Sequence, residues 1–145
     1  LWSAESTPAI GFNDDNVIKT VYDPCPVGFK IPTFKAFTGF TSDGNNQTTL
    51  ANINVDGTTE YQKYSSAFGH KFWTNSSKTA TIFFPGVGQR YPIDGSMVNL
   101  TAGYYWAAIP KDQYFGCFLF FGHTFVQPQA SHNRPNGYAV RPVSE

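Results

Sequence analysis

The segment from Gln113 to Asn133 constrains the fold most, because it combines many large aromatic side chains with a complete absence of Asp, Glu, Lys and Arg. A β-strand turns alternate side chains to opposite faces, so a strand here can bury only every second residue on one face. If Leu119 and Phe121 face a core, Phe118 and Phe120 face the other way. Large apolar patches are rare on monomers, and aromatic side chains dominate binding interfaces. The segment therefore predicts a ligand-binding face, the alternative being that every ring belongs to the core.

The composition favours a single turn-rich domain with much β-structure. The chain has 13 Gly and 10 Pro, with 17% aromatic and 14% charged residues, whereas a helical bundle would need more Leu, Glu, Lys and Ala. We expect one domain over residues 1–145, with residues 1–16 as a linker or edge segment. The net charge of zero and the lack of a basic run argue against nucleic-acid binding, and the apolar stretches are too short to insert into a membrane. Because the chain begins at Leu1 rather than Met, we interpret it as a piece of a larger protein.

Local patterns predict several short elements. Thr33 is a candidate helix N-cap, and Phe34, Phe37 and Phe40 follow at helical spacing, which predicts a short helix with an aromatic inner face. The stretch 41–59 is rich in Asn, Thr and Gly and predicts a long surface loop. Strand-like patterns occupy residues 17–22, 79–86, 88–91, 104–108 and 137–143, and residues 72–73 predict a strand or a buried loop.

Four sequence motifs in a fixed order carry a family resemblance. They are DPCPVGFKIPT at 23–33, FFPGVGQRY at 83–91, GYYWAA at 103–108 and NGYAVRPVSE at 136–145. Together they resemble a C-type-lectin-like domain of the kind found at the C-termini of exported surface proteins and fimbrillin-type pilus tip proteins of anaerobic gut bacteria. The resemblance implies a compact α+β fold, with short helices, small twisted antiparallel sheets and long loops, and with its two termini close together.

A narrower resemblance concerns the C-terminal third. The order YYWAA, an irregular stretch and NRPNGYAVRPV is similar to the variable region of proteins diversified by diversity-generating retroelements. Such proteins display ligand-binding side chains on a stable lectin-like scaffold. The implied scaffold positions are Tyr105, Trp106, Leu119, Phe121, Val126, Arg134, Gly137, Tyr138, Val140 and Arg141. The implied ligand-binding positions are Ile109, Asp112, Tyr114, Cys117, Phe118, Phe120, His123, Phe125, Gln127, Gln129 and His132.

Other chemistries find little support in the sequence. A thiolate dyad would pair Cys117 with His123 or His132, but no general base with an orienting carboxylate is visible, so no enzyme activity is predicted. Calcium binding needs converging carboxylates, and the Gln127-Pro128-Gln129 run has no acidic partner, so we expect no metal or cofactor. Cys25 and Cys117 form either a disulfide or two unpaired small apolar side chains.

These observations predict a non-enzymatic adhesin domain that displays an aromatic surface to a protein, glycoprotein or glycan ligand. The alternative is a structural pilus or cell-surface subunit whose aromatic stripe is covered by another subunit. The resemblance implies an exported protein at a bacterial cell surface or pilus tip, with pilus subunits as further partners.

Overall fold

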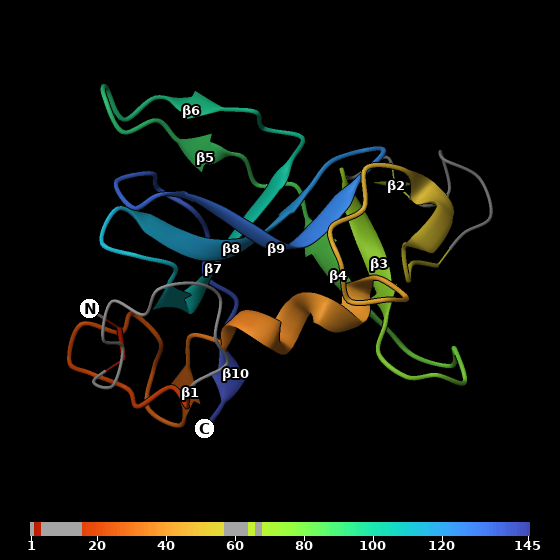
Figure 1. Ribbon diagram of the computed structural model, residues 1–145, viewed down its shortest axis with the longest axis horizontal. Coiled ribbons are helices and arrows are strands. Elements are labelled where there is room, and N and C mark those ends of the chain that lie inside the picture. Colours follow the sequence, from red (N-terminus) through yellow and green to blue (C-terminus); the bar gives the residue numbers. More distant parts are fainter. Residues whose placement is uncertain (1, 4–15, 57–63, 66–67) are drawn as a thin grey trace.

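The computed structural model of the chain describes residues 2–3, 16–56, 64–65 and 68–145. These residues form small antiparallel sheets and short 3-10 helices, an arrangement of the α+β type (Figure 1). In the described ranges the sheets have the strand orders β1-β10, β2-β3-β4, β5-β6 and β7-β8-β9. Within the described ranges, no helix is long and apolar enough to cross a membrane.

The central sheet is a three-stranded meander. It consists of β7 (Gly103–Pro110), β8 (Phe115–Phe121) and β9 (Val126–Asn133), in the order β7-β8-β9. The turn between β7 and β8 is fixed by the carboxylate of Asp112, which accepts hydrogen bonds from the backbone N–H groups of Tyr114 (2.7 Å) and Phe115 (2.8 Å). This local bonding explains why the chain reverses directly before the aromatic run of β8.

The two faces of β8 divide its side chains as the alternation predicts. Leu119 and Phe121 are fully buried in the main core. Phe118 belongs to a separate cluster on the other face, against which Phe120 packs. The register assigned to this strand from the sequence is therefore confirmed.

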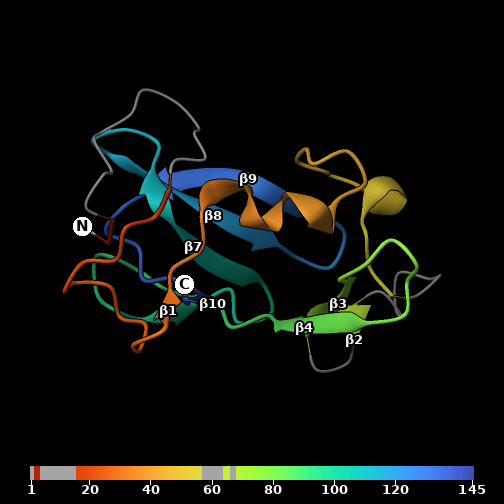
Figure 2. The ribbon, with the colours of Figure 1, turned by 90° about the horizontal axis from the view of Figure 1, so that it is seen from below.

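The main core lies between the central sheet, the second sheet and the first helix. The second sheet contains β2 (Tyr64–Ser65), β3 (Gly69–Trp73) and β4 (Thr81–Pro85). The helix η1 (Phe34–Phe40) runs below the central sheet toward β3 and β4, and Figure 2 shows it against β8 and β9. The ring of Phe40 stacks on Phe72 with centroids 3.9 Å apart, which joins the helix to the second sheet.

Short elements complete the fold. The strands β1 (Phe29–Lys30) and β10 (Val143–Ser144) pair, so the C-terminus lies beside residues 29–30. The strands β5 (Gln89–Arg90) and β6 (Met97–Val98) form a hairpin at the opposite side of the molecule in Figure 1. A second helix, η2 (Leu50–Asn52), has a single turn.

The first motif of the family resemblance folds around Asp23. Its carboxylate accepts hydrogen bonds from the N–H groups of Cys25 (2.8 Å) and Ile31 (3.1 Å), and Lys19 Nζ lies 3.7 Å away. Burial alone would raise the pKa of Asp23, but the two N–H donors and the nearby ammonium outweigh it and hold this pKa below its usual range. The Asp23 carboxylate is therefore ionised at neutral pH, and as an anion it accepts both hydrogen bonds of the turn.

Most of the predicted elements are present, with some differences. The short helix is confirmed, although Thr33 makes no side-chain cap and the helix is of the 3-10 type. Strands at 72–73, 79–86, 88–91 and 104–108 correspond to β3, β4, β5 and β7. The loop 41–59 has buried residues at Ile53 and Val55, so its described part is not merely a surface excursion.

Two predicted strands are wrong. Residues 17–22 form only an isolated bridge between Lys19 and Ser3, because a turn follows in which Asp23 N–H donates to Thr20 O. Residues 137–143 cross from one sheet to another, so Gly137 bridges Arg90 of β5 and Ala139 bridges Tyr105 of β7. Of the predicted linker 1–16, residues 1 and 4–15 lie outside the described part.

Candidate ligand-binding groove

The second face of the central sheet carries a stacked aromatic cluster. We call Tyr104, Trp106, Phe118, Phe120 and Tyr138 the second-face cluster. The Tyr138 ring lies 4.3 Å from that of Trp106, 4.7 Å from that of Phe118 and 5.0 Å from that of Tyr104. Tyr104 also stacks on Phe120 at 4.7 Å. Aromatic pairs at these separations stabilise one another beyond their burial, so the face is a fixed platform.

Backbone bonds of the neighbouring residue hold Tyr138 over the sheet. The N–H of Ala139 donates to Tyr104 O, and Ala139 O accepts from the N–H of Trp106, both at 3.0 Å. These bonds extend the sheet by one residue and place the Tyr138 ring on top of Phe118. Phe118 is therefore only 3% exposed.

A groove of about 480 Å³ lies over this cluster. We call it the aromatic groove; aromatic rings and uncharged polar side chains line it. The lining residues are Asn46, Gln89, Tyr104, Phe118, Phe120, Gln127, Gln129, Ala130, Ser131, His132 and Tyr138. This set contains no Asp, Glu, Lys or Arg, so the groove suits a ligand without strong charge at the contact.

A loop distant in sequence forms one wall of the groove. Asn46 Oδ1 accepts from the N–H of Gln129 at 2.9 Å, and Asn46 Nδ2 donates to Gln129 O at 3.1 Å. The side chain of Gln129 in turn donates to Gly44 O at 2.6 Å. Gln47 and Val126 exchange two backbone hydrogen bonds beside it. The loop is therefore docked on β9 as an additional edge.

The polar groups of the groove leave some bonding capacity unused. The Oε1 atom of Gln89 is buried and accepts no hydrogen bond, which is costly unless a ligand or water supplies a donor. Burial raises the pKa of the Tyr138 hydroxyl and also that of Tyr104, against the opposing hydrogen bond from Asn99. Both phenols are therefore neutral hydrogen-bond donors at neutral pH. His132 Nδ1 lies 2.6 Å from Asn136 Nδ2.

Five of the predicted ligand-binding residues line this one groove. They are Phe118, Phe120, Gln127, Gln129 and His132. Phe125 packs edge-on against Phe120 with centroids 4.6 Å apart, at the end of the same face. His123 is exposed in the adjacent turn, Tyr114 is 66% exposed at the β7–β8 turn, and Asp112 is half-buried there. These last three lie away from the groove lining.

Three predicted surface positions are corrected by the structure. Ile109 is 2% exposed because it alternates with Tyr105 and Ala107 and therefore faces the main core with them. Cys117 is fully buried because it shares the face of Leu119 and Phe121. Phe118 points away from the main core as predicted, but it is not exposed to solvent, because the other rings of the second-face cluster cover it.

Some residues of the aromatic groove are not predicted from the sequence to bind a ligand. Tyr138 is expected in the scaffold, yet its ring forms part of the groove floor. Tyr104 pairs with Phe120 across the strands, a relation that alternation in both segments implies once the pairing is known. Asn46 lies 83 residues before Gln129, and no local pattern could join them.

The thiols have no activating environment in the structure. Cys25 and Cys117 are both free and buried. Burial raises the pKa of Cys25 to about 11 and that of Cys117 to about 12. Both are uncharged at neutral pH, and a neutral thiol is a poor nucleophile. Among the described residues, no three His, Cys, Asp or Glu side chains gather closely enough to hold a metal ion.

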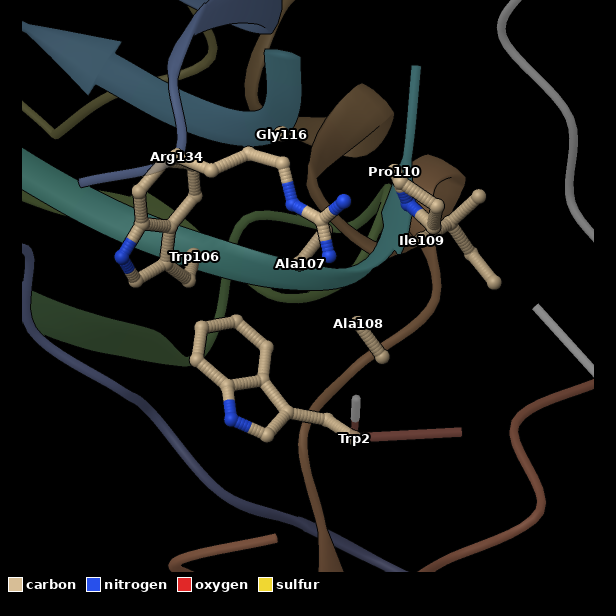
Figure 3. A pocket seen from close by; sticks show the side chains of 8 residues that line it. All are labelled: Trp2, Trp106, Ala107, Ala108, Ile109, Pro110, Gly116 and Arg134. Carbon is tan, nitrogen blue, oxygen red and sulfur yellow. The ribbon is translucent and has the colours of Figure 1, made fainter. Parts of the chain in front are cut away.

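A smaller hollow of about 90 Å³ lies at the edge of the second-face cluster. Figure 3 shows the indole of Trp2 beside that of Trp106, with Arg134 reaching across toward Ala107 and Pro110. The two indole rings are 6.2 Å apart and tilted. Residue 2 thus packs on the central sheet, and the hollow is too small for more than a few atoms.

Comparison with protein-family models, curated proteins and solved structures gives no match to this chain.

Proposed function

We propose that this chain is a non-enzymatic ligand-binding domain that captures its ligand on the aromatic groove. The observation that carries the proposal is the floor of stacked rings bordered by the amide side chains of Gln89, Gln127 and Gln129, without a charged residue in the lining. Rings supply contact area at low cost in side-chain entropy, and amides give direction to the contact. Because stacking fixes the rings before binding, little further ordering is needed when the ligand arrives.

We further propose that the fold is C-type-lectin-like and that the domain acts as an adhesin at a bacterial cell surface or pilus tip. The pairing of β1 with β10, which brings the C-terminus beside residues 29–30, supports this fold. Two of the motifs that carry the resemblance have structural roles in the chain: Asp23 organises the first, and the last supplies the ring of Tyr138. A protein or glycoprotein ligand suits a groove in which Phe120 and Tyr138 keep part of their ring surface exposed.

The proposal is tested by screening the purified chain against arrays of glycans and extracellular proteins. For each ligand found, the Phe120→Ser variant is compared with the parent chain, because Phe120 lies in the groove and is only partly buried. Truncating an aromatic anchor costs about 2 kcal/mol of binding free energy, so we expect binding about 30-fold weaker.

Tyr22→Ser is the matched control, because Tyr22 is 69% exposed and lies outside the groove lining. It should leave the affinity unchanged. A ligand whose affinity is the same for the parent and Phe120→Ser, or is lowered equally by Tyr22→Ser, would contradict capture at the groove.

A further inference from the structure

A second, larger hollow lies between η1, the β3–β4 hairpin and the C-terminal segment. It has a volume of about 690 Å³, within the range usual for small-molecule sites, and we call it the hairpin groove. It shares no lining residue with the aromatic groove. A ligand of this hollow would therefore contact none of the residues that line the aromatic groove.

The apolar wall of the hairpin groove is built from rings that are locked together. Phe40 stacks on Phe72 at 3.9 Å and meets Phe84 edge-on at 5.0 Å. Phe37 packs edge-on against Phe84 at 6.2 Å. Phe40 and Trp73 are only half-buried and both line the hollow, so flat aromatic surface remains available in it.

Only two charged side chains line the hairpin groove, and both are cationic. The half-buried guanidinium of Arg141 lies 4.8 Å from the centroid of Phe84, and its Nη1 donates to Phe83 O at 3.2 Å. Lys78 stands at the rim. Across the described part of the chain, no carboxylate forms an ion pair with either residue. A partly desolvated guanidinium without a counter-ion favours the approach of an anion.

The hairpin turn holds Lys78 in an uncommon backbone conformation. Its φ of 53° lies in the left-handed region, which non-glycine residues seldom adopt. The turn is closed by Asn75, which exchanges two side-chain hydrogen bonds with Thr79, at 2.9 and 3.0 Å. The structure therefore fixes the backbone of the second cation at the groove rim.

We propose that the hairpin groove binds a small organic anion with an aromatic body. Its anionic group pairs with Arg141, and Lys78 adds a second positive charge to the lining. No described carboxylate forms an ion pair with either residue. Its ring lies against Phe40 and Trp73. The groove walls are formed before binding, so the ligand needs no rearrangement of the fold.

Indole-3-acetate is a suitable probe, with indole-3-acetamide as its uncharged counterpart. Titration of the chain is followed by backbone amide chemical shifts in an NMR spectrum. We expect saturable shifts confined to residues around 36–42, 73–78 and 141–143, with a Kd on the order of 1 mM for a ligand of this size. The acetamide should bind about fivefold more weakly, because it lacks the charge.

Variants at the rim test the charge requirement without disturbing the core. Lys78→Gln removes one cation, and Ser76→Glu adds a carboxylate at an exposed lining position. Both variants should lower the affinity for indole-3-acetate and leave the affinity for indole-3-acetamide unchanged. Lys71→Gln is the control, because Lys71 is exposed on β3 but does not line the groove.

Several results would overturn the proposal. They are equal affinity for the acid and the amide, shifts centred outside the hairpin groove, and equal effects of Lys78→Gln and Lys71→Gln. Retained melting temperatures would show that a loss of binding in the variants does not come from unfolding. A negative result at the hairpin groove would not contradict the function proposed for the aromatic groove. That function is tested with Phe120→Ser, and the two linings share no residue.

Discussion

The adjacent residues Phe118 and Leu119 are both buried, yet they pack on opposite faces of the central sheet. Leu119 lies in the main core, where it has no exposed surface. Phe118 lies in the second-face cluster, covered by Tyr138. Both faces of β8 therefore contribute to stability. A face whose side chains were exposed to solvent would contribute little. The Phe118 side chain therefore both lines the aromatic groove and packs in the folded structure.

This arrangement predicts a graded response to substitution along the segment. Leu119→Ala and Phe118→Ala should each lower the free energy of unfolding by roughly 2–5 kcal/mol, because each removes buried apolar area and leaves a cavity. Tyr114→Ser should change it by no more than about 0.5 kcal/mol, since Tyr114 is 66% exposed. Denaturant unfolding of the three variants measures the effects. A neutral Phe118→Ala would show that the second face is not packed.

At the scale of elements, the fold depends on contacts between segments that local patterns cannot connect. The alternation in β8 and the phenylalanine spacing of η1 are visible in the sequence, because each follows from the geometry of one element. The docking of Asn46 on β9, which forms the groove wall, is not visible in the sequence. The residues around Asn46 favour a loop, but they do not indicate which strand the loop contacts. The register shift between Trp106 and Pro110, where Ala108 also packs into the main core, likewise depends on strand pairing, which no single segment encodes.

The same limit applies to the last residues of the chain. Residues 137–143 alternate like a strand, but they cross from β5 past β7 to β10. Gly137 and Ala139 form isolated bridges, and only Val143 belongs to a strand. Alternation reports which residues face inward and not which strand they meet. Tyr138 therefore enters the groove floor although its sequence context suggests only scaffold.

The turn around Asp23 makes the stability of the β1–β10 region dependent on pH. The pKa of Asp23 is lowered on folding, because the N–H groups of Cys25 and Ile31 and the ammonium of Lys19 outweigh its burial. A lowered folded-state pKa contributes stability that is fully present above the unfolded value, near 3.9, and is lost as pH falls through the folded value. The melting temperature should therefore decrease when the pH is lowered below about 4.

Asp23→Asn provides the control for this pH effect. The variant should melt at a lower temperature than the parent at pH 7, because the N–H groups of Cys25 and Ile31 donate to different oxygens of Asp23 and the amide nitrogen of Asn cannot accept a hydrogen bond. It should also lose less stability between neutral and acidic pH. Parallel acid profiles of parent and variant would contradict a role for the Asp23 carboxylate in the turn.

At the scale of the whole molecule, the two grooves differ in charge and lie over different sheets. The aromatic groove lies over β7, β8 and β9 and has an uncharged lining, whereas the hairpin groove lies against β3, β4 and η1 and carries two cations. A neutral surface and a cationic one call for different partners. The two linings share no residue, so ligands of the two proposed sites would contact different side chains.

Neither groove has the carboxylates that a calcium ion requires. Calcium takes six to eight oxygen ligands, usually with several carboxylates, and neither lining contains Asp or Glu. We therefore expect EDTA to leave the melting temperature unchanged, and ligand binding at the aromatic groove should persist in the chelator. Melting curves of the same preparation with EDTA and with added calcium chloride make the comparison, and magnesium chloride controls for ionic strength. A rise of several degrees with calcium alone would mean that the ion binds at a site outside both grooves and helps to hold the fold.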